Sequence, residues 1–195
     1  MTVKIFGITG GIGSGKSVVS RLMETMDIPV YVADVESKSL LDTSAQLKSA
    51  LTEAFGSNLY EKGFIDRKLF ASIIFNDPEK LQLANKIIHP FVKQHFFDWV
   101  EKQRNAGKKT VATEAAILYE SGFDQFVDKV ILVYAPLETR IHRTMLRDNA
   151  SREQVEARIK SQMQDEDKIK KANFVILNDG TKSIIHQIEV ILGQE

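Results

Sequence analysis

Short apolar segments alternate along this chain with longer segments in which apolar and polar residues recur at helical spacing. Five of the short segments have the length and the aliphatic character of buried strands: Val3–Ile8, Pro29–Ala33, Thr110–Thr113, Val130–Tyr134 and Phe174–Leu177. Strands that are apolar on both faces and alternate with helices are typical of a parallel sheet covered by helices. We therefore expect an α/β fold in three layers, with a central parallel sheet between helices.

Local signals mark several of the helices. The first is expected over Lys16–Met26, with these apolar residues on one side: Val18, Val19, Leu22 and Met26. Pro136 suits the first turn of a helix that carries three arginines. Ser151 with Gln154 three residues later is a capping-box signal. A last amphipathic helix is predicted over Ile184–Leu192.

The block from Asp34 to about Trp99 is predicted to be mainly helical. Its apolar residues recur at helical spacing: Leu47, Leu51, Ala54, Phe55, Leu69, Ile73 and Ile74. Pro78 can start a helix, whereas Pro90 is expected to kink or break the helix that contains it. We expect this block to be a lobe inserted into the sheet domain, starting where open α/β sheets place ligands.

Composition limits the classes of function. The 195 residues, 43% hydrophobic and 27% charged, suit a single globular domain. Lys plus Arg (26) balance Asp plus Glu (26), so no overall charge attracts nucleic acid or an anionic membrane, and we expect neither as a partner. Cysteine is absent, which excludes disulfides and thiol catalysis and is compatible with a reducing cytosol.

No apolar run approaches the roughly 20 residues of a membrane-spanning helix. The first apolar segment, Val3–Thr9, is too short for a secretory signal, and glycines follow it at once. We therefore expect a soluble, cytoplasmic protein, either a monomer or a small homo-oligomer.

The strongest chemical signal is Gly10-Gly11-Ile12-Gly13-Ser14-Gly15-Lys16-Ser17, which fits G-x-x-x-x-G-K-[ST]. Glycines let the backbone curl around a phosphate, and the N-terminus of the following helix adds positive charge. Lys16 can reach the β- and γ-phosphates of a nucleotide, and the Ser17 hydroxyl can bind Mg²⁺. The alternative is a glycine-rich turn with a surface lysine, but the strand before it and the helix after it favour the phosphate loop. The residues expected at the nucleotide are Gly11, Ile12, Gly13, Ser14, Gly15, Lys16 and Ser17.

A phosphate loop indicates a nucleoside triphosphate without naming the acceptor. The guanine-reading pattern N-K-x-D is missing, since Asn85-Lys86-Ile87-Ile88 lacks the Asp. A motor or a large ATPase would need more chain. A small-molecule kinase is the class that remains.

Three acids are candidates for chemistry. Asp34 follows the second strand and can accept the proton of an attacking hydroxyl, or it can cap the following helix. Glu114 ends the third strand, where a carboxylate holds Mg²⁺ through water, or it is an ordinary surface acid. Glu120 lies in a loop near the same edge, where it contacts substrate or is simply solvated.

Arg140, Arg143 and Arg147 form one stripe on a helix. Guanidinium groups match phosphate oxygens and can neutralise charge in a transition state, although a solvated face is the commoner fate of such a run. His89 precedes Pro90 and is by itself more typical of a structural residue. No cluster has transition-metal spacing, so Mg²⁺ brought with the nucleotide is the only metal expected.

Together these residues resemble the dephospho-CoA kinase family. The opening, Gly7–Ser17, is similar to that of the family almost letter for letter. Further matches follow in order along nearly the whole chain: Ala33-Asp34, Phe64-Ile65-Asp66-Arg67, Ile74-Phe75, His89-Pro90, Ile117-Leu118-Tyr119-Glu120-Ser121-Gly122, Ser151-Arg152-Glu153 and Asn178-Asp179-Gly180.

The resemblance implies a nucleoside-monophosphate-kinase-like fold with a core (about 1–34, 107–135 and 172–195), a helical substrate lobe (about 35–106) and a lid (about 136–171). It implies that ATP, with Mg²⁺, phosphorylates the ribose 3′-hydroxyl of dephospho-coenzyme A. The catalytic residues would be Asp34 (the general base), Lys16 and Arg140. Arg143, Arg147, Asn178 and Gly180 would contact the nucleotide. The residues on the acceptor side would be Asp34, His89, Leu118, Tyr119 and Glu120. The metal would be bound by Ser17 and Glu114.

The chain departs from the family pattern at four positions. Val32 stands where the family usually has Asp, which leaves Asp34 as the sole base candidate there. Glu114 replaces a usual Asp, Ala116 a usual Pro and Tyr119 a usual Phe. Two alternatives stay open: another small-molecule or nucleoside monophosphate kinase, and a nucleotide-binding regulator that transfers nothing.

Overall fold

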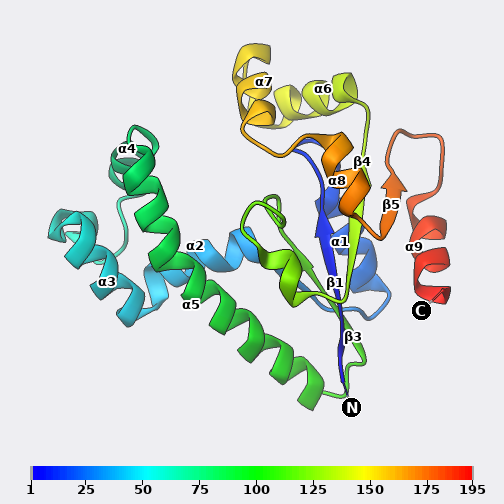
Figure 1. The fold of residues 1–195 in the computed structure, drawn as a ribbon, viewed down its shortest axis with the longest axis horizontal. Coiled ribbons are helices and arrows are strands. Elements are labelled where there is room, and N and C mark those ends of the chain that lie inside the picture. Colours follow the sequence, from blue (N-terminus) through cyan, green and yellow to red (C-terminus); the bar gives the residue numbers. More distant parts are fainter. Residues whose placement is uncertain (1, 195) are drawn as a thin grey trace. The chain divides into compact units, whose positions relative to one another are not determined.

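The computed structural model describes residues 2–194 (Figure 1). The chain divides into two compact units, which are described separately below. The first combines Met1–Val32 with Lys102–Glu195, and the second is Ala33–Glu101. Of the helices built by the described residues, none combines the length and the apolar character that crossing a membrane requires.

The first unit is built on a five-stranded parallel sheet. Its strands are β1 (Lys4–Thr9), β2 (Val30–Val32), β3 (Thr110–Glu114), β4 (Lys129–Tyr134) and β5 (Phe174–Leu177). They are ordered β2-β3-β1-β4-β5, and every neighbouring pair is parallel. All five predicted strands are therefore confirmed, as is the α/β class. Glu114 pairs with Ile8 on one side and Val32 on the other, so it lies at the carboxyl edge of three strands.

The helices of this unit are α1 (Lys16–Thr25), α6 (Leu137–Asp148), α7 (Arg152–Lys160), α8 (Asp165–Lys171) and α9 (Ile184–Gly193). A short 3-10 turn, Phe123–Phe126, precedes β4. Pro136 occupies the N-cap of α6, and the capping box of Ser151 and Gln154 at α7 is confirmed. Helix α8 was not predicted, because its sequence DEDKIKK has no apolar stripe.

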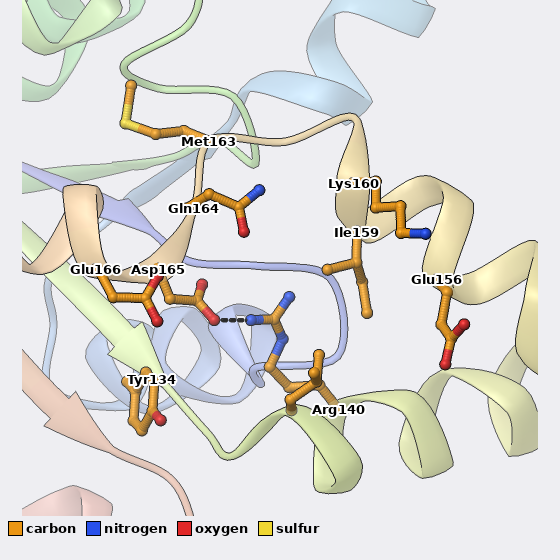
Figure 2. A pocket seen from close by; sticks show the side chains of 10 residues that line it. Tyr134, Arg140, Glu156, Ile159, Lys160, Met163, Gln164, Asp165 and Glu166 are labelled. Carbon is orange, nitrogen blue, oxygen red and sulfur yellow. Dashed lines mark hydrogen bonds and ion pairs between the residues drawn. The ribbon is translucent and has the colours of Figure 1, made fainter.

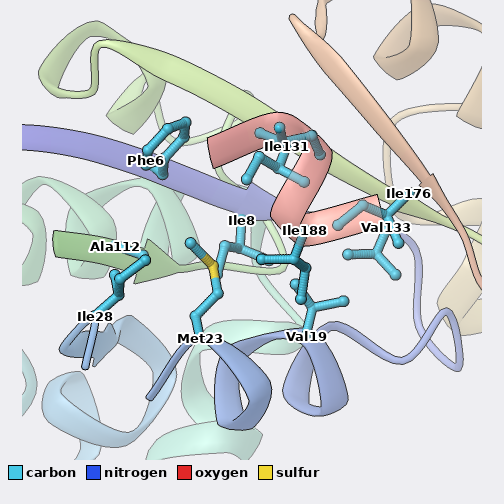
Figure 3. Close-up of a cluster of buried hydrophobic side chains, with 11 residues drawn as sticks. Phe6, Ile8, Val19, Met23, Ile28, Ala112, Ile131, Val133, Ile176 and Ile188 are labelled. Carbon is cyan, nitrogen blue, oxygen red and sulfur yellow. The ribbon is translucent and has the colours of Figure 1, made fainter. Parts of the chain in front are cut away.

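Helices α1 and α9 cover one face of the sheet with an apolar core (Figure 3). The core residues are Phe6, Ile8, Val19, Met23, Ile28, Ala112, Ile131, Val133, Ile176, Ile188 and Ile191. The predicted apolar side of α1 was partly wrong, since Val18 is 45% exposed and Met23 is fully buried. On the opposite face the 115–127 segment lies so close that a side chain at Gly7 would meet Leu118 and Val127.

The second unit is helical, as predicted for this block. It contains α2 (Ala33–Thr43), α3 (Ala45–Phe55), a 3-10 turn (Ser57–Tyr60), α4 (Arg67–Phe75) and α5 (Pro78–Asn105), whose last turn belongs to the first unit. Pro78 starts α5, as expected. Pro90, however, does not break the helix, because α5 runs through Pro90 to Asn105. The backbone hydrogen bond that proline cannot donate therefore costs less free energy than the packing of this long helix contributes.

Buried residues from all its helices form the core of the second unit: Leu41, Leu47, Leu51, Leu59, Tyr60, Ile65, Phe70, Ile74 and Ala84. Tyr60 donates its hydroxyl hydrogen to Leu41 O at 2.9 Å, and burial raises its pKa to about 12. Asp66 caps α4 by accepting from the amides of Lys68 and Leu69. This explains structurally why an Asp stands at the start of that helix.

Candidate active site

The loop between β1 and α1 has the backbone of a phosphate-binding loop. Gly13 and Gly15 have φ of 78° and 94°, in the left-handed region that side chains rarely adopt. A side chain at Gly13 would also meet Arg140 O and Thr144 Oγ1 of α6. The loop therefore lies directly on α6, and only glycine fits there. Val18 N and Val19 N donate to Gly15 O, whereas the amides before them point out of the N-terminal end of α1, where an anion can bind.

A cavity of about 180 Å³ opens against this loop. It is lined by Gly13, Gly15, Lys16, Ser17, Glu114, Arg143 and Arg147. Lys16 Nζ donates to Gly10 O at 2.9 Å, which holds the ammonium over the loop. Three cationic side chains, the loop amides and the N-terminus of α1 thus face one small space, as a polyphosphate requires.

A hydroxyl and a carboxylate group also line this cavity. Ser17 is exposed at its wall, and Glu114 ends β3 beside it. Ser20, which the sequence did not suggest, lies with its Oγ 2.7 Å from Glu114 Oε2 and 3.1 Å from Lys16 O. The Ser20 hydroxyl therefore orients the Glu114 carboxylate from α1.

These oxygen groups fit Mg²⁺, which takes hard oxygen ligands and keeps several waters when it binds with a nucleotide. No cluster of three or more His, Asp or Glu side chains able to hold a metal by itself occurs within residues 2–194. Ser17 and Glu114 are the oxygen donors that the cavity itself offers to such an ion.

The three arginines of α6 have different environments. Arg140 is buried, its Nε donates to Ile12 O at 3.0 Å, and its guanidinium forms an ion pair with Asp165 (Figure 2). Arg143 is half-buried and donates to Asn178 O at 3.1 Å. Arg147 is exposed and lines the cavity with Arg143. The stripe thus divides into one arginine beneath the loop and two at the cavity.

Arg147 is held by a carboxylate on its own helix. Asp148 accepts from Arg147 Nε at 2.7 Å and also pairs with Arg158 of α7. The hydrogen bond from Arg147 lowers the pKa of Asp148, and the same bond raises the pKa of Arg147. This exposed pair is a weak restraint, so Arg147 can exchange Asp148 for another anion.

Asn178, at the end of β5, also contacts the phosphate loop. Its Nδ2 donates to Ser14 O at 2.8 Å, and a side chain at Gly15 would collide with it. Gly180, two residues on, has a φ of 89° in the turn that follows. The segment predicted to lie by the adenine is therefore anchored to the loop itself.

The residues of the loop 118–120 are buried in the first unit or bonded to other residues of it. Leu118 is fully buried, and the Tyr119 hydroxyl is buried with no hydrogen-bond partner among residues 2–194. Burial raises the pKa of Tyr119 to about 12. Glu120 Oε1 accepts from Met163 N at 2.8 Å and lies 3.5 Å from Lys168 Nζ. Lys168 has no exposed side-chain surface and was missed, because nothing in a run of charged residues marks one as buried.

Asp34 and His89, the other predicted acceptor-side residues, belong to the second unit. Asp34 is the second residue of α2, so it lies inside the first turn and does not cap the helix. An acid in this turn is stabilised by the helix dipole. His89 is half-buried in α5, and burial lowers its pKa, which favours the neutral imidazole.

Comparisons with known proteins, by family model, by sequence and by structure, each find proteins similar to this chain over most of its length. A family model described as dephospho-CoA kinase matches residues 4–183. A dephospho-CoA kinase of Bacteroides fragilis (strain YCH46) is 47% identical over 188 residues, covering 96% of this chain and 90% of that protein. The crystal structure of a Thermus thermophilus protein is similar with a TM-score of 0.83 at 33% identity, covering 100% of this chain and 98% of that one. A dephospho-CoA kinase from Campylobacter jejuni gives a TM-score of 0.70 at 28% identity, covering 100% of this chain and 97% of that one.

Proposed function

Because the chain belongs to the dephospho-CoA kinase family, we propose that it transfers the γ-phosphoryl group of ATP to the ribose 3′-hydroxyl of dephospho-coenzyme A. The products are coenzyme A and ADP, and the reaction is the last step of coenzyme A synthesis. The observation that carries the proposal is the cavity at the phosphate loop, where Lys16, Arg143 and Arg147 face the first amides of α1.

The loop and its cations bind the triphosphate. The amides of Gly13, Gly15, Lys16 and Ser17 bind the β-phosphate region, and Lys16 Nζ leaves Gly10 O to meet the β- and γ-phosphates. The amides of Ile12 and Ser14 keep their partners within the protein. Ser17 and, through water, Glu114 would hold Mg²⁺, which would neutralise charge on the phosphates when bound. Ser20 keeps Glu114 turned toward that position.

Asp34 is the general base in this proposal. Its place in the chain supports this role, since β2 ends at Val32, the register partner of Glu114, and Asp34 follows two residues later. The carboxylate accepts the hydroxyl proton while the bond from O3′ to the γ-phosphorus forms and the bond to the ADP oxygen breaks. Val32 carries no carboxylate, so Asp34 performs this step without an acidic neighbour at position 32.

The remaining assignments divide between nucleotide and acceptor. Arg143 and Arg147 neutralise charge on the transferring group. Arg140, which the resemblance implies to be catalytic, is bonded to Ile12 O and Asp165 and does not line this cavity, so we assign it the support of the loop instead. Asn178 and Gly180 lie by the adenine. The acceptor contacts His89 and the loop of Leu118, Tyr119 and Glu120.

The proposal extends to the organisation of the chain. The core (about 1–34, 107–135 and 172–195) carries the nucleotide, the segment 35–106 carries the acceptor, and the segment 136–171 acts as the lid. The protein works in the cytoplasm as a monomer or small homo-oligomer without nucleic acid. The balanced charge and the absence of cysteine support this setting.

The test is ADP formation from Mg-ATP with a panel of acceptors: dephospho-coenzyme A, adenosine, AMP and shikimate. The proposal predicts brisk ADP release with dephospho-coenzyme A alone, and a product whose new phosphate is on the 3′ position by ³¹P NMR. Lys16→Ala serves as the matched inactive control. Preference for another acceptor would favour a different small-molecule kinase, and ATP binding without transfer to any acceptor would favour a regulator.

A further inference from the structure

Both polar backbone atoms of Ile12, at the tip of the phosphate loop, are held by side chains from the 137–165 region. Arg140 Nε donates to Ile12 O at 3.0 Å, and Ile12 N donates to Gln162 Oε1 at 3.0 Å. Arg140 is in turn paired with Asp165, three residues after Gln162 (Figure 2). The segment that follows α7 therefore reaches the loop tip twice, once directly and once through Arg140.

This part of the loop needs an external restraint. Ile12 has a glycine on each side, and Gly10 precedes that pair, so its peptides rotate more freely than those of other residues. In a trans peptide the C=O and the N–H point in opposite directions. The bond from Arg140 to Ile12 O therefore turns the Gly13 N–H away from the guanidinium. Gly13 itself lines the cavity with Lys16.

Gln162 fixes the preceding peptide, between Gly11 and Ile12, in the same way. Its N–H bond holds this peptide plane, and Arg140 holds the next one. With both planes fixed, the loop cannot turn its amides out of the cavity without breaking a hydrogen bond to a side chain.

The turn that presents Gln162 is itself well ordered. Gln162 N donates to Ile159 O at 3.1 Å, and Ser161 N donates to Ala157 O at 3.2 Å, which continue the end of α7. On the other side Met163 N donates to Glu120 Oε1 at 2.8 Å. The backbone is therefore anchored immediately before and after Gln162, so its side chain is held at the loop tip at little entropic cost.

We propose that Gln162 is a positioning residue for the nucleotide: it accepts the Ile12 N–H and thereby holds the loop tip in the conformation that receives the triphosphate. The inference rests on the proposed use of this loop for ATP. Gln162 is not part of the phosphate-loop pattern. It lies in the segment between α7 and α8, at least 145 residues after that loop in the chain.

The test compares Gln162→Ala with Gln162→Glu and with Gln164→Ala. Glutamate keeps an acceptor oxygen at the same reach. Gln164 is an exposed glutamine in the same turn, and its recorded hydrogen bonds are two backbone bonds, in which Gln164 O accepts from Asp167 N and Lys168 N of α8, so it is the matched control. Three quantities are measured on the full chain: hydrogen exchange of the Ile12 amide in ¹⁵N-isoleucine-labelled protein, the Kd of a non-hydrolysable Mg-ATP analogue, and the melting temperature.

For Gln162→Ala we expect Ile12 exchange to accelerate, and the analogue to bind more weakly, by about three- to tenfold each, the size of one lost hydrogen bond. The melting temperature and kcat should stay close to those of the unaltered chain, while KM for ATP rises. Gln162→Glu should restore slow exchange at Ile12, and Gln164→Ala should change nothing. Unchanged exchange and Kd in Gln162→Ala would overturn the inference, as would equal losses in Gln164→Ala. Exchange and binding need no phosphoryl acceptor, so the inference and the proposed function fail in separate measurements.

Discussion

Replacing Glu120 with glutamine separates two roles for this residue. Glu120 is the counter-charge of Lys168, whose side chain has no exposed surface and whose ammonium lies 3.5 Å from Glu120 Oε1. Glutamine keeps the carbonyl oxygen that accepts from Met163 N and removes only the charge. Lys168 Nζ already makes no hydrogen bond among the described residues, so the substitution leaves a buried ammonium without its counter-charge as well.

The expected cost follows from burial. Breaking a fully buried ion pair costs about 3–5 kcal/mol, because the remaining charge cannot be solvated. Glu120 itself keeps 24% of its side chain exposed, so the pair is partly screened. We therefore expect Glu120→Gln to lower the free energy of unfolding by about 2–3 kcal/mol and the melting temperature by about 4–12 °C.

The assay is urea unfolding of four chains: the unaltered chain, Glu120→Gln, Lys168→Met and the double variant. Methionine nearly matches the shape of lysine without its charge. The double variant should recover most of the loss and fall within about 1 kcal/mol of the unaltered chain. Strictly additive losses would refute the reasoning. A normal unfolding midpoint in Glu120→Gln with a raised KM for the acceptor would instead assign Glu120 to substrate contact alone.

Three further predictions concern the nucleotide, the base and pH. Lys16→Ala should weaken Mg-ATP binding by about 10- to 100-fold in a calorimetric titration, since a charged hydrogen-bond donor is lost; a normal Kd would contradict the loop assignment. Asp34→Asn should leave that Kd nearly unchanged while turnover falls by about 10²–10⁴, and unaltered turnover would reject Asp34 as the base. Burial raises the pKa of Tyr60 from 10.0 to about 12, so its contribution to stability is complete below pH 10 and lost as pH rises toward 12. Urea unfolding midpoints between pH 9 and 12 should show this loss of stability, about 2 kcal/mol. In Tyr60→Phe the part of the loss that comes from Tyr60 ionisation should be absent.

Much of the fold was predictable because its signals are local. Buried parallel strands are apolar on both faces, so all five stand out in the sequence, and the capping box at Ser151 marks α7 directly. Helix α8 could not be predicted, since its seven residues are all charged except Ile169. Of the two outcomes expected at Pro90, a break in the helix was wrong, because α5 continues through Pro90. The rule that proline ends a helix is local and does not include the tertiary packing of α5.

The site was only partly readable from the sequence. The phosphate loop has a fixed pattern because its backbone geometry requires glycine at fixed places. The environments of the three arginines depend on tertiary contacts: Arg140 is buried because it meets Ile12 and Asp165, and spacing along α6 alone does not distinguish it from Arg147. Ser20, Gln162 and Lys168 were missed for the same reason, since their partners lie far away in the chain.

The most direct test of the central claim is a crystal structure with a non-hydrolysable Mg-ATP analogue and dephospho-coenzyme A bound together. We predict a triphosphate on the phosphate loop, bound by the amides of Gly13 and Gly15 and by those that open α1, with the acceptor 3′-hydroxyl about 2.6–3.2 Å from the Asp34 carboxylate. A triphosphate bound elsewhere, or a 3′-hydroxyl that faces a different side chain, would contradict the account.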